Sequence, residues 1–558
     1  MNRTRRQLQR LAFGMAWVLL SATPPVFADD AEELSEHLLQ AELALQNSQY
    51  QEAASEYRKA AELSDDPEIA EKAARIAYSY GFNKEALRSA KRWAKLDDEN
   101  DEALLYVSQL YLRTGEIRNS QRSFEKLLKR GREPADERLL ALIPFLSQED
   151  ESLAYELMLK LAKPYKNSAE ANYAVAVMAL QAGDTETAGE RAKIASGIEP
   201  DWVKPHLLYA RAMLLSGDED GAIDYTSRIV GDDPDPDPEA RLELAIMLLS
   251  AGRDDDALSQ VNQILLEQPA RTDALRLMAI INFRLEHLDA ARADFQDLLE
   301  SGHYTMDALY YLGRIADRNS ELELALRYYS QVTRGSNAII SQRRAAGIMA
   351  QMGEEEEALE YLSEFAKDNP NYAVDMLQAR AQLLASMKRY PEALEYYDKV
   401  VAYRPDNEGA HLGKAELLLT MDRVDDAIKL YRKTLKRWPD SAMTLNALGY
   451  TLADRTDQYD EAEKLIHKAL ERDPESAAII DSWGWVLYRQ GQNDEALAQL
   501  ERAYERLRDP EVASHIVEVL WALERHDDAE TTLENAELLF PENRLLKSVR
   551  ERLLPDTP

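Results

Sequence analysis

Near the carboxyl end of the chain, aromatic rings recur beside amide and carboxylate side chains at helical spacing. Asn446 is followed four residues later by Tyr450, and Asp481 is followed at the same interval by Trp485, with Tyr488 close behind. Trp and Tyr rings provide a large contact area at little cost in rotamer entropy, and a neighbouring amide or carboxylate can hydrogen-bond to a peptide backbone. This combination predicts that these residues bind another polypeptide.

The sequence contains none of the usual catalytic patterns. Its eight histidines are scattered without the spacing of zinc ligands, and it has no cysteine. A Gly-x-Ser-x-Gly elbow, a Walker loop and a dinucleotide fingerprint are all missing. Carboxylates are frequent, but with 30% charged residues neighbouring pairs on helix faces are expected by default. We therefore expect a protein that is not an enzyme and that binds neither a metal ion nor a cofactor.

The predicted binding residues belong to a repeat of two short helices, which is clearest from Ala477 to Pro510. Apolar residues recur every three or four positions in each half, and Gly491 separates the halves. Small residues at the helix crossing, Gly484 and Ala496, allow the two helix axes to approach closely. Two such helices cannot bury their apolar faces alone, so neighbouring copies must stack on them.

The same spacing continues along the chain from residue 29 onward. Small residues that open each second helix recur at gaps of 33, 34 or 35 positions. They are Ala53, Ala86, Ser120, Ala154, Ala188, Ala222, Ala257, Ala291, Ala325, Ala358, Ala393, Ala427, Ala462, Ala496 and Ala529. This period resembles the tetratricopeptide repeat (TPR). The resemblance implies an all-α fold, a right-handed TPR solenoid (a superhelix of about fifteen helix-turn-helix repeats) with a carboxyl-terminal capping helix.

Departures from the pattern indicate how the chain is divided. The unit over 135–168 has Leu142 where a small residue belongs and Pro144 inside its first helix, which predicts a kinked repeat. We therefore expect an amino-terminal TPR arm over 29–168 with a degenerate fourth repeat, a regular TPR array over 169–541, and a capping helix and tail over 542–558.

The first 28 residues have the pattern of a signal peptide, with four arginines, ten apolar residues and a small-residue cleavage site ending at Ala28. Residues 20–23, Leu-Ser-Ala-Thr, resemble a bacterial lipoprotein box in which threonine replaces the lipidated cysteine. No apolar run reaches the ~18 residues that cross a bilayer. We expect an exported, periplasmic protein that meets a membrane only indirectly, through a partner at the outer membrane.

The charge balance bears on the class of partner. The formal net charge is -34, whereas binding along a nucleic-acid backbone depends on clustered Lys and Arg. We expect proteins or peptides as partners and no nucleic acid. The sequence does not indicate the oligomeric state.

In a TPR solenoid the first helices of successive repeats line a concave groove. The predicted groove residues are Asn446, Tyr450, Asp481, Trp485, Tyr488 and Trp521 in the carboxyl-terminal repeats and, further upstream, Tyr310 and Arg314. Two interpretations of the rings remain open: they contact a bound polypeptide, or they fill space between repeats, as we expect for Trp483.

Residues 445–455, 481–485 and 509–512 narrow the resemblance. They are similar to the signature of exported proteobacterial TPR proteins, some of which are outer-membrane lipoproteins that act as adaptors of periplasmic carboxyl-terminal processing proteases. The resemblance implies a non-catalytic scaffold that binds such a protease and presents its substrates. The alternative is a structural TPR component of an envelope assembly or polysaccharide export complex. The lipidation cysteine found in that group is missing here.

Overall fold

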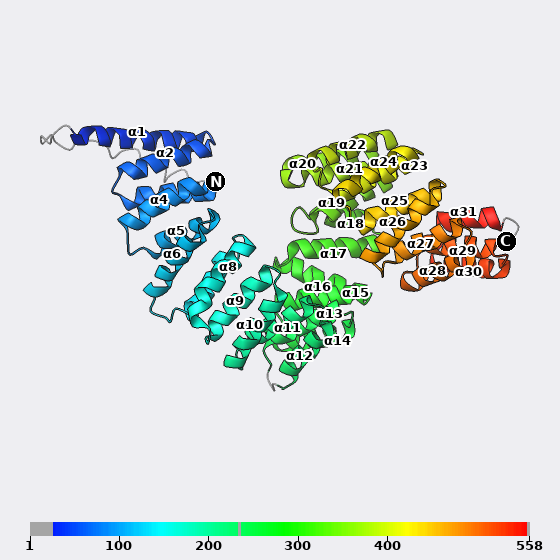
Figure 1. Cartoon of the computed structure of the whole chain (residues 1–558), viewed down its shortest axis with the longest axis horizontal. Coiled ribbons are helices and arrows are strands. Elements are labelled where there is room, and N and C mark those ends of the chain that lie inside the picture. The colour runs from blue at the N-terminus through cyan, green and yellow to red at the C-terminus, as the bar shows by residue number, and fades with distance from the viewer. Residues whose placement is uncertain (1–25, 233–235, 555–558) are drawn as a thin grey trace. The chain divides into compact units, whose positions relative to one another are not determined.

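Pairs of helices joined by short turns make up the computed structural model, which describes residues 26–232 and 236–554. Within these residues there is no β-strand, and the only other regular elements are two single 3-10 turns. By internal contacts the chain divides into an amino-terminal unit, residues 1–291, and a carboxyl-terminal unit, residues 292–558. In each unit, consecutive helix pairs lie side by side (Figure 1). The prediction of an all-α TPR superhelix is confirmed.

The helices of the amino-terminal unit are α1 Val26–Gln46, α2 Tyr50–Leu63, α3 Pro67–Ser79, α4 Asn83–Leu96, α5 Asp101–Arg113, α6 Ile117–Arg130, α7 Glu137–Leu146, α8 Glu151–Ala162, α9 Ala169–Gln181, α10 Thr185–Ile198, α11 Val203–Leu215, α12 Glu219–Asp232, α13 Pro238–Ser250, α14 Asp254–Glu267 and α15 Thr272–Arg284. Helix α16, Leu288–Ser301, contains the boundary between the two units.

The helices of the carboxyl-terminal unit are α17 Thr305–Arg318, α18 Leu322–Tyr329, α19 Ala338–Gln351, α20 Glu355–Asp368, α21 Ala373–Ser386, α22 Tyr390–Tyr403, α23 Glu408–Thr420, α24 Val424–Arg437, α25 Ala442–Arg455, α26 Tyr459–Arg472, α27 Ala477–Arg489, α28 Asn493–Arg506, α29 Pro510–Ala522, α30 His526–Leu539 and α31 Arg544–Leu553. Odd-numbered helices are the first helices of their repeats and even-numbered helices the second, up to α30.

The small residues that define the repeat are all buried. Each of the fifteen positions from Ala53 to Ala529 that open a second helix is at most 2% exposed. Where the first helix has glycine, the approach is closer still: a Cβ atom built on Gly484 would lie 2.7 Å from Cγ of Leu500 and 3.2 Å from the backbone oxygen of Ala496. A larger side chain at these crossings would therefore force the two helices apart.

In most repeats the turn between the two helices contains a residue in the left-handed conformation. In the clearest repeat this residue is Gly491, with φ of 81°, directly after α27. Its N–H donates to the oxygen of Tyr488 at 2.9 Å, and the N–H of Gln492 donates to the oxygen of Leu487 at 2.9 Å. These two bonds satisfy carbonyl groups that the helix end would otherwise leave unpaired, which is why glycine ends the helix here.

The repeat with proline in its first helix departs from the regular arrangement. Helix α7 has only 10 residues and contains Pro144. It packs mainly on α9 rather than on its own partner α8. Leu142, which replaces the small residue, is buried there beside Leu139 and Leu146. The bulky side chain and the proline explain why the usual close pairing is lost. A domain boundary at residue 168 remains a prediction.

At the carboxyl end, α31 covers the last repeat. Leu546 and Val549 are buried in the same cluster as Val517 of α29 and Leu533 of α30. At the other end, the predicted signal peptide lies almost wholly outside the described residues and remains a prediction. No helix within residues 26–232 and 236–554 is both long and apolar enough to span a bilayer.

Candidate functional site

A pocket of about 470 Å³ lies among the carboxyl-terminal repeats. The first helices of four consecutive repeats, α23, α25, α27 and α29, supply most of its lining. Three predicted groove residues, Asn446, Tyr450 and Asp481, line it together with Glu416, Tyr431, Thr451, Ser482, Asp509 and Glu511, among others. We call this cavity the carboxyl-terminal pocket. The repeat brings these side chains together because equivalent positions of stacked first helices face the same side.

The polar groups in the carboxyl-terminal pocket are mostly hydrogen-bond acceptors. Oδ1 of Asn446 is buried and has no hydrogen-bond partner among the described residues. Burial raises the pKa of the Glu416 carboxyl. Burial, together with the charges of Asp481 and Asp509, raises the pKa of Glu511, although His515 opposes this. A cationic or N–H-bearing group placed here would therefore relieve an excess of acceptors.

Asp481, which lines this pocket, also contacts a buried histidine, His515. Its Oδ1 lies 2.9 Å from Nδ1 of His515, and both side chains are less than 10% exposed. Burial alone would lower the pKa of His515, but the hydrogen bond and charge of Asp481, with the charges of Glu511 and Glu518, raise it. The hydroxyl of Tyr450 lies 3.4 Å from Nε2 of the same ring. The histidine thus fixes two of the predicted groove residues.

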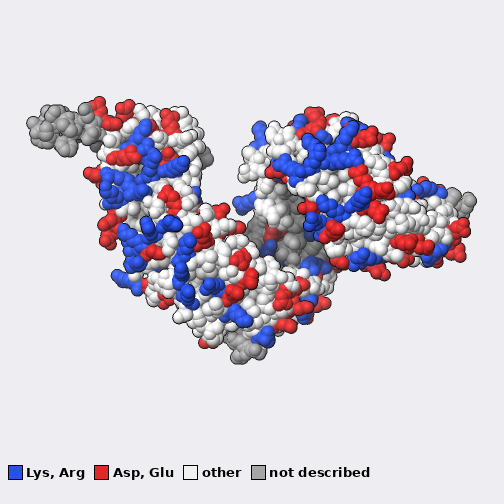
Figure 2. Space-filling model, in the orientation of Figure 1, with Lys and Arg blue, Asp and Glu red and all other residues white. Residues whose placement is uncertain are grey.

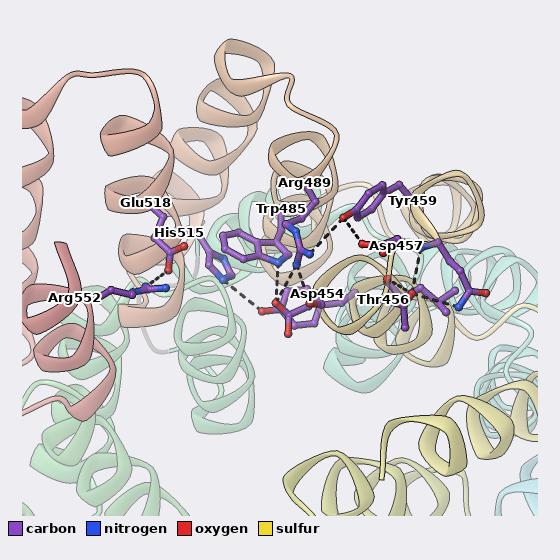
Figure 3. A network of polar contacts seen from close by, with 12 residues as sticks. Asp454, Thr456, Asp457, Tyr459, Trp485, Arg489, His515, Glu518 and Arg552 are labelled. Atoms are coloured by element: carbon purple, nitrogen blue, oxygen red, sulfur yellow. Dashed lines mark hydrogen bonds and ion pairs between the residues drawn. The ribbon is translucent and has the colours of Figure 1, made fainter. Parts of the chain in front are cut away.

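Trp485 extends this network to the preceding repeat (Figure 3). Its ring stacks on His515 at 4.1 Å between centroids, and its Nε1–H donates to Oδ1 of Asp454 at 3.2 Å. The guanidinium of Arg489 donates to the backbone oxygen of Asp454 at 2.8 Å. Only 7% of Trp485 is exposed. The ring therefore fills space between repeats, which is the second of the two interpretations of the sequence.

Tyr488 and Trp521 lie outside the carboxyl-terminal pocket. Tyr488 is partly buried, and its ring lies 5.1 Å from that of Trp485. Trp521 is partly buried against the same apolar cluster, with its ring 4.1 Å from that of His526. Both rings retain some exposed surface, so contact with a partner remains a prediction for them.

The two upstream residues line a separate pocket of about 450 Å³. Tyr310 and Arg314 of α17 meet Tyr329 of α18 and Arg343 and Arg344 of α19, with Ile340 and Gly347 completing the lining. We call this cavity the arginine pocket. The guanidinium carbon of Arg314 lies 5.6 Å from the centre of the Tyr310 ring. Helices α17 and α19 thus supply three guanidinium groups, and these lie beside one tyrosine ring from α17 and one from α18.

Sequence reasoning did not assign a role to His515, Asp454 or Glu416. The spacing contained one usable signal, since His515 follows Asp481 by one full repeat of 34 residues. Glu416 had a signal too, because it directly follows the small residue Ala415, as Tyr450 follows Gly449. Asp454 offered none, because acidic residues are frequent on every helix.

The kinked repeat produces a further feature that was not predicted. A wide depression of about 1020 Å³ lies beside α7 and α9, which pack on each other. Its lining includes Glu137, Arg138, Glu170 and Trp202. Acidic and basic side chains are mixed there, and none of the predicted groove residues lies in it.

Comparisons with known proteins place these features in a family. Sequence patterns described as tetratricopeptide repeat match residues 220–281 and 384–447, and a second pattern of that description matches 277–338 and 350–408. Residues 455–536 match a pattern described as subunit 3 of the anaphase-promoting complex, or cyclosome. A TPR repeat-containing protein of Pseudomonas aeruginosa is 30% identical over 498 residues, which cover 89% of this chain and 84% of that protein.

Two solved structures align over most of the chain. The Cut9–Hcn1 hetero-tetramer of the anaphase-promoting complex is 15% identical, over 95% of this chain and 98% of that chain, with a TM-score of 0.34. Yeast Tom70 is 16% identical, over 94% of this chain and 96% of that chain, with a TM-score of 0.34. On the strength of the Pseudomonas relative, the chain belongs to the tetratricopeptide-repeat proteins. Repeats of this kind indicate a scaffold for interactions between proteins.

Proposed function

We propose that the protein is an exported, non-catalytic scaffold whose carboxyl-terminal repeats bind an extended polypeptide. The observation that carries this proposal is the unpaired, buried Oδ1 of Asn446 in a pocket lined by four consecutive first helices. A backbone N–H of a bound strand would satisfy this oxygen, and leaving such a group unpaired costs about 1–3 kcal/mol. Glu416 and Glu511 on either side favour a basic residue in the bound segment.

We further propose that this polypeptide belongs to a carboxyl-terminal processing protease of the envelope or to one of its substrates. The support is the resemblance of residues 445–455, 481–485 and 509–512 to exported adaptors. Asn446, Tyr450, Asp481 and Glu511, which fall within those stretches, lie around the same pocket. Because residues of all three stretches meet at this pocket, we infer that the partner binds there.

Site-specific photocrosslinking in producing cells tests both statements. Ala478 is exposed and lines the carboxyl-terminal pocket, whereas Ala498 is exposed on α28 of the same repeat and does not line it. A photoreactive residue at position 478 should form a covalent adduct with a partner protein, while the same residue at position 498 should not. Mass spectrometry of the adduct identifies the partner.

The possible adducts separate the hypotheses. A processing protease or a cell-wall hydrolase at position 478 supports the adaptor role. Synthase or pore subunits would support the alternative, a structural part of an envelope assembly or polysaccharide export complex. Equal adducts at positions 478 and 498 would contradict the assignment of the groove.

Periplasmic location is part of the same proposal and has its own test. Amino-terminal sequencing of the protein recovered from a periplasmic extract should begin near Asp29. Recovery of the chain from the cytoplasm with its first 28 residues intact would contradict export.

A further inference from the structure

Two neighbouring second helices of the amino-terminal unit have matching rows of basic residues. Helix α4 has five Lys or Arg and one acidic residue, and α6 has the same balance. The rows coincide because a step of 34 residues relates them. The pairs are Lys84 with Arg118, Arg88 with Arg122, Arg92 with Lys126, and Lys95 with Lys129. We call these eight residues the basic face.

Most cations of the basic face are free of ion pairs. Arg92 is half-buried and contacts Asp65 at 2.7 Å. The other seven are exposed, and none has an ion pair or a side-chain hydrogen bond within the described part of the chain. Figure 2 shows Lys and Arg gathered over the part of the amino-terminal unit that contains α4 and α6. Their charge is therefore available to a partner.

The basic face is distinctive because two consecutive second helices share it. Helix α24 also has five Lys or Arg, against two acidic residues, but the next second helix, α26, has three Lys or Arg against four acidic residues. At the same four positions α20 has Glu356, Glu360, Glu364 and Lys367. The whole chain has a net charge of -34, whereas α4 and α6 each have five Lys or Arg against one acidic residue. A strongly asymmetric charge distribution orients a protein against a charged surface, because the basic side is attracted while the remainder is repelled.

The arrangement fits a flat, densely anionic surface. The first and last cations of each row are eleven residue steps apart, about 16 Å along the helix. Neither α4 nor α6 has a large exposed apolar or aromatic side chain. Binding of single-stranded nucleic acid relies on aromatic stacking, which this face cannot offer. Solvent-exposed ion pairs with a short acidic peptide are individually weak. A bilayer of anionic lipids instead presents many headgroups in one plane, and basic residues near it add their contributions.

We propose that the basic face of α4 and α6 docks on the surface of a bilayer containing anionic phospholipids. The chain would then meet a membrane directly, in addition to any contact made through a partner. The attraction is electrostatic and peripheral, since no apolar side chain of these helices is positioned to insert. The basic face and the carboxyl-terminal pocket have no residue in common.

Sedimentation of the full chain with lipid vesicles tests this proposal. We expect binding to vesicles of phosphatidylglycerol mixed with phosphatidylcholine and at least ~10-fold weaker binding to phosphatidylcholine alone. Raising the salt from about 50 to about 200 mM should release the protein, because screening shortens the reach of the charges. Equal binding to both kinds of vesicle, or binding that resists salt, would overturn the proposal.

A matched pair of variants assigns the binding to these helices. The quadruple change Arg88→Gln, Lys95→Gln, Arg122→Gln and Lys129→Gln removes two exposed cations from each row and should weaken binding at least ~10-fold. The control, Lys433→Gln, Lys436→Gln, Arg437→Gln and Lys464→Gln, removes four exposed cations from α24 and α26 and should change it less than ~2-fold. Equal losses in both variants would contradict the basic face as the site.

Competition distinguishes a membrane from other anionic partners. Soluble polyglutamate or duplex DNA at equal concentration of charge should displace little of the protein from the vesicles. Preferential transfer to either polymer would overturn the proposal and would assign the basic face to an acidic polypeptide or a nucleic acid. Circular dichroism of the basic-face variant should match that of the unaltered chain, since none of its four altered cations makes an ion pair or a side-chain hydrogen bond within the described residues.

Discussion

The carboxyl-terminal pocket and the arginine pocket occupy equivalent places in the repeat yet have opposite chemistry. Tyr310, Asn446 and Asp481 each lie three residues before a glycine of a first helix, and Arg314, Tyr450 and Trp485 each follow that glycine. In one pocket these positions meet guanidinium groups, and in the other they meet carboxylates. The repeat thus determines where a side chain points, while the neighbouring repeats determine the charge that surrounds it.

The two pockets also differ in how firmly their charged groups are held. In the carboxyl-terminal repeats, Asp481 and His515 are both buried. Beside the arginine pocket, Arg344 makes two bonds to Asp317, at 2.5 and 2.6 Å, but its side chain is 39% exposed. A buried pair costs much more to break than an exposed one, because removing one partner leaves the other charge without solvent. This difference can be measured.

The largest effect is expected from Asp481→Ala. The ring of His515 would lose the buried carboxylate that raises its pKa, and the carboxyl-terminal repeats should lose about 3 kcal/mol of stability. Asp317→Ala, the matched change beside the arginine pocket, should cost about 1 kcal/mol. Native-state hydrogen exchange is the suitable measurement, because repeat proteins unfold locally. Equal losses at the two sites would show that burial does not distinguish them.

A second comparison concerns Gly484 of α27 and Gly313 of α17, which occupy equivalent positions in first helices that line the two pockets. Gly484→Ala would bring a Cβ atom to 2.7 Å from Leu500 and 3.2 Å from a backbone oxygen, whereas in Gly313→Ala the close atoms belong only to the ring of Tyr329. Overpacking costs about 1–3 kcal/mol, and the loss should be larger where backbone cannot move aside. Thermal unfolding of the two variants measures this, and a stable Gly484→Ala protein would contradict the tight crossing.

Much of this architecture could be predicted from the sequence, because sterics repeat with the chain. Ala53 and Ala496 lie far apart in sequence, yet each is fully buried at a helix crossing, as their common spacing requires. The grouping of Asn446, Tyr450 and Asp481 follows from the same logic, since stacked helices bring equivalent positions to one side. The 34-residue period therefore predicts which residues of successive repeats lie next to one another.

The charge of each pocket could not be predicted in this way. The spacing assigns Glu416 to the groove, because it follows Ala415 as Tyr450 follows Gly449. It does not predict that Glu416 and Asp481, two repeats apart, line the same pocket. Trp485 matched the expected pattern of a groove residue, but its ring stacks on His515 of the next repeat. Contacts of this kind decide whether a ring lies in a groove or between repeats.

The proposed binding of basic segments in the carboxyl-terminal pocket gives a third prediction. Glu416→Gln combined with Glu511→Gln should weaken binding of a lysine-rich peptide about 10-fold, equivalent to about 1.4 kcal/mol. Arg343→Gln, in the arginine pocket, should leave that affinity unchanged. Fluorescence anisotropy of a labelled peptide measures both. Stronger binding of the lysine-rich peptide to the double variant would show that the acceptors around Asn446 do not select a cation.

The smallest effect expected is a dependence on pH that only one pocket shows. The pKa of His515 is raised in the folded protein. The stability that this histidine contributes to the fold is therefore complete at pH values below its pKa in the unfolded chain, about 6.5, and is lost as the pH rises through its pKa in the folded protein. Hydrogen exchange in α27 and α29 should accordingly reveal lower stability at pH 8 than at pH 6. The His515→Gln variant should lose this difference.

The arginine pocket provides the internal control for that measurement. Its lining contains no histidine and no carboxylate, and burial raises the pKa of Tyr329 away from the neutral range. Exchange in α17 and α19 should therefore be equally protected at pH 6 and pH 8 once the intrinsic rate is allowed for. A pH response of the same size in both regions would mean that the buried histidine is not its origin, because no ionisable group of the arginine pocket changes charge over this interval.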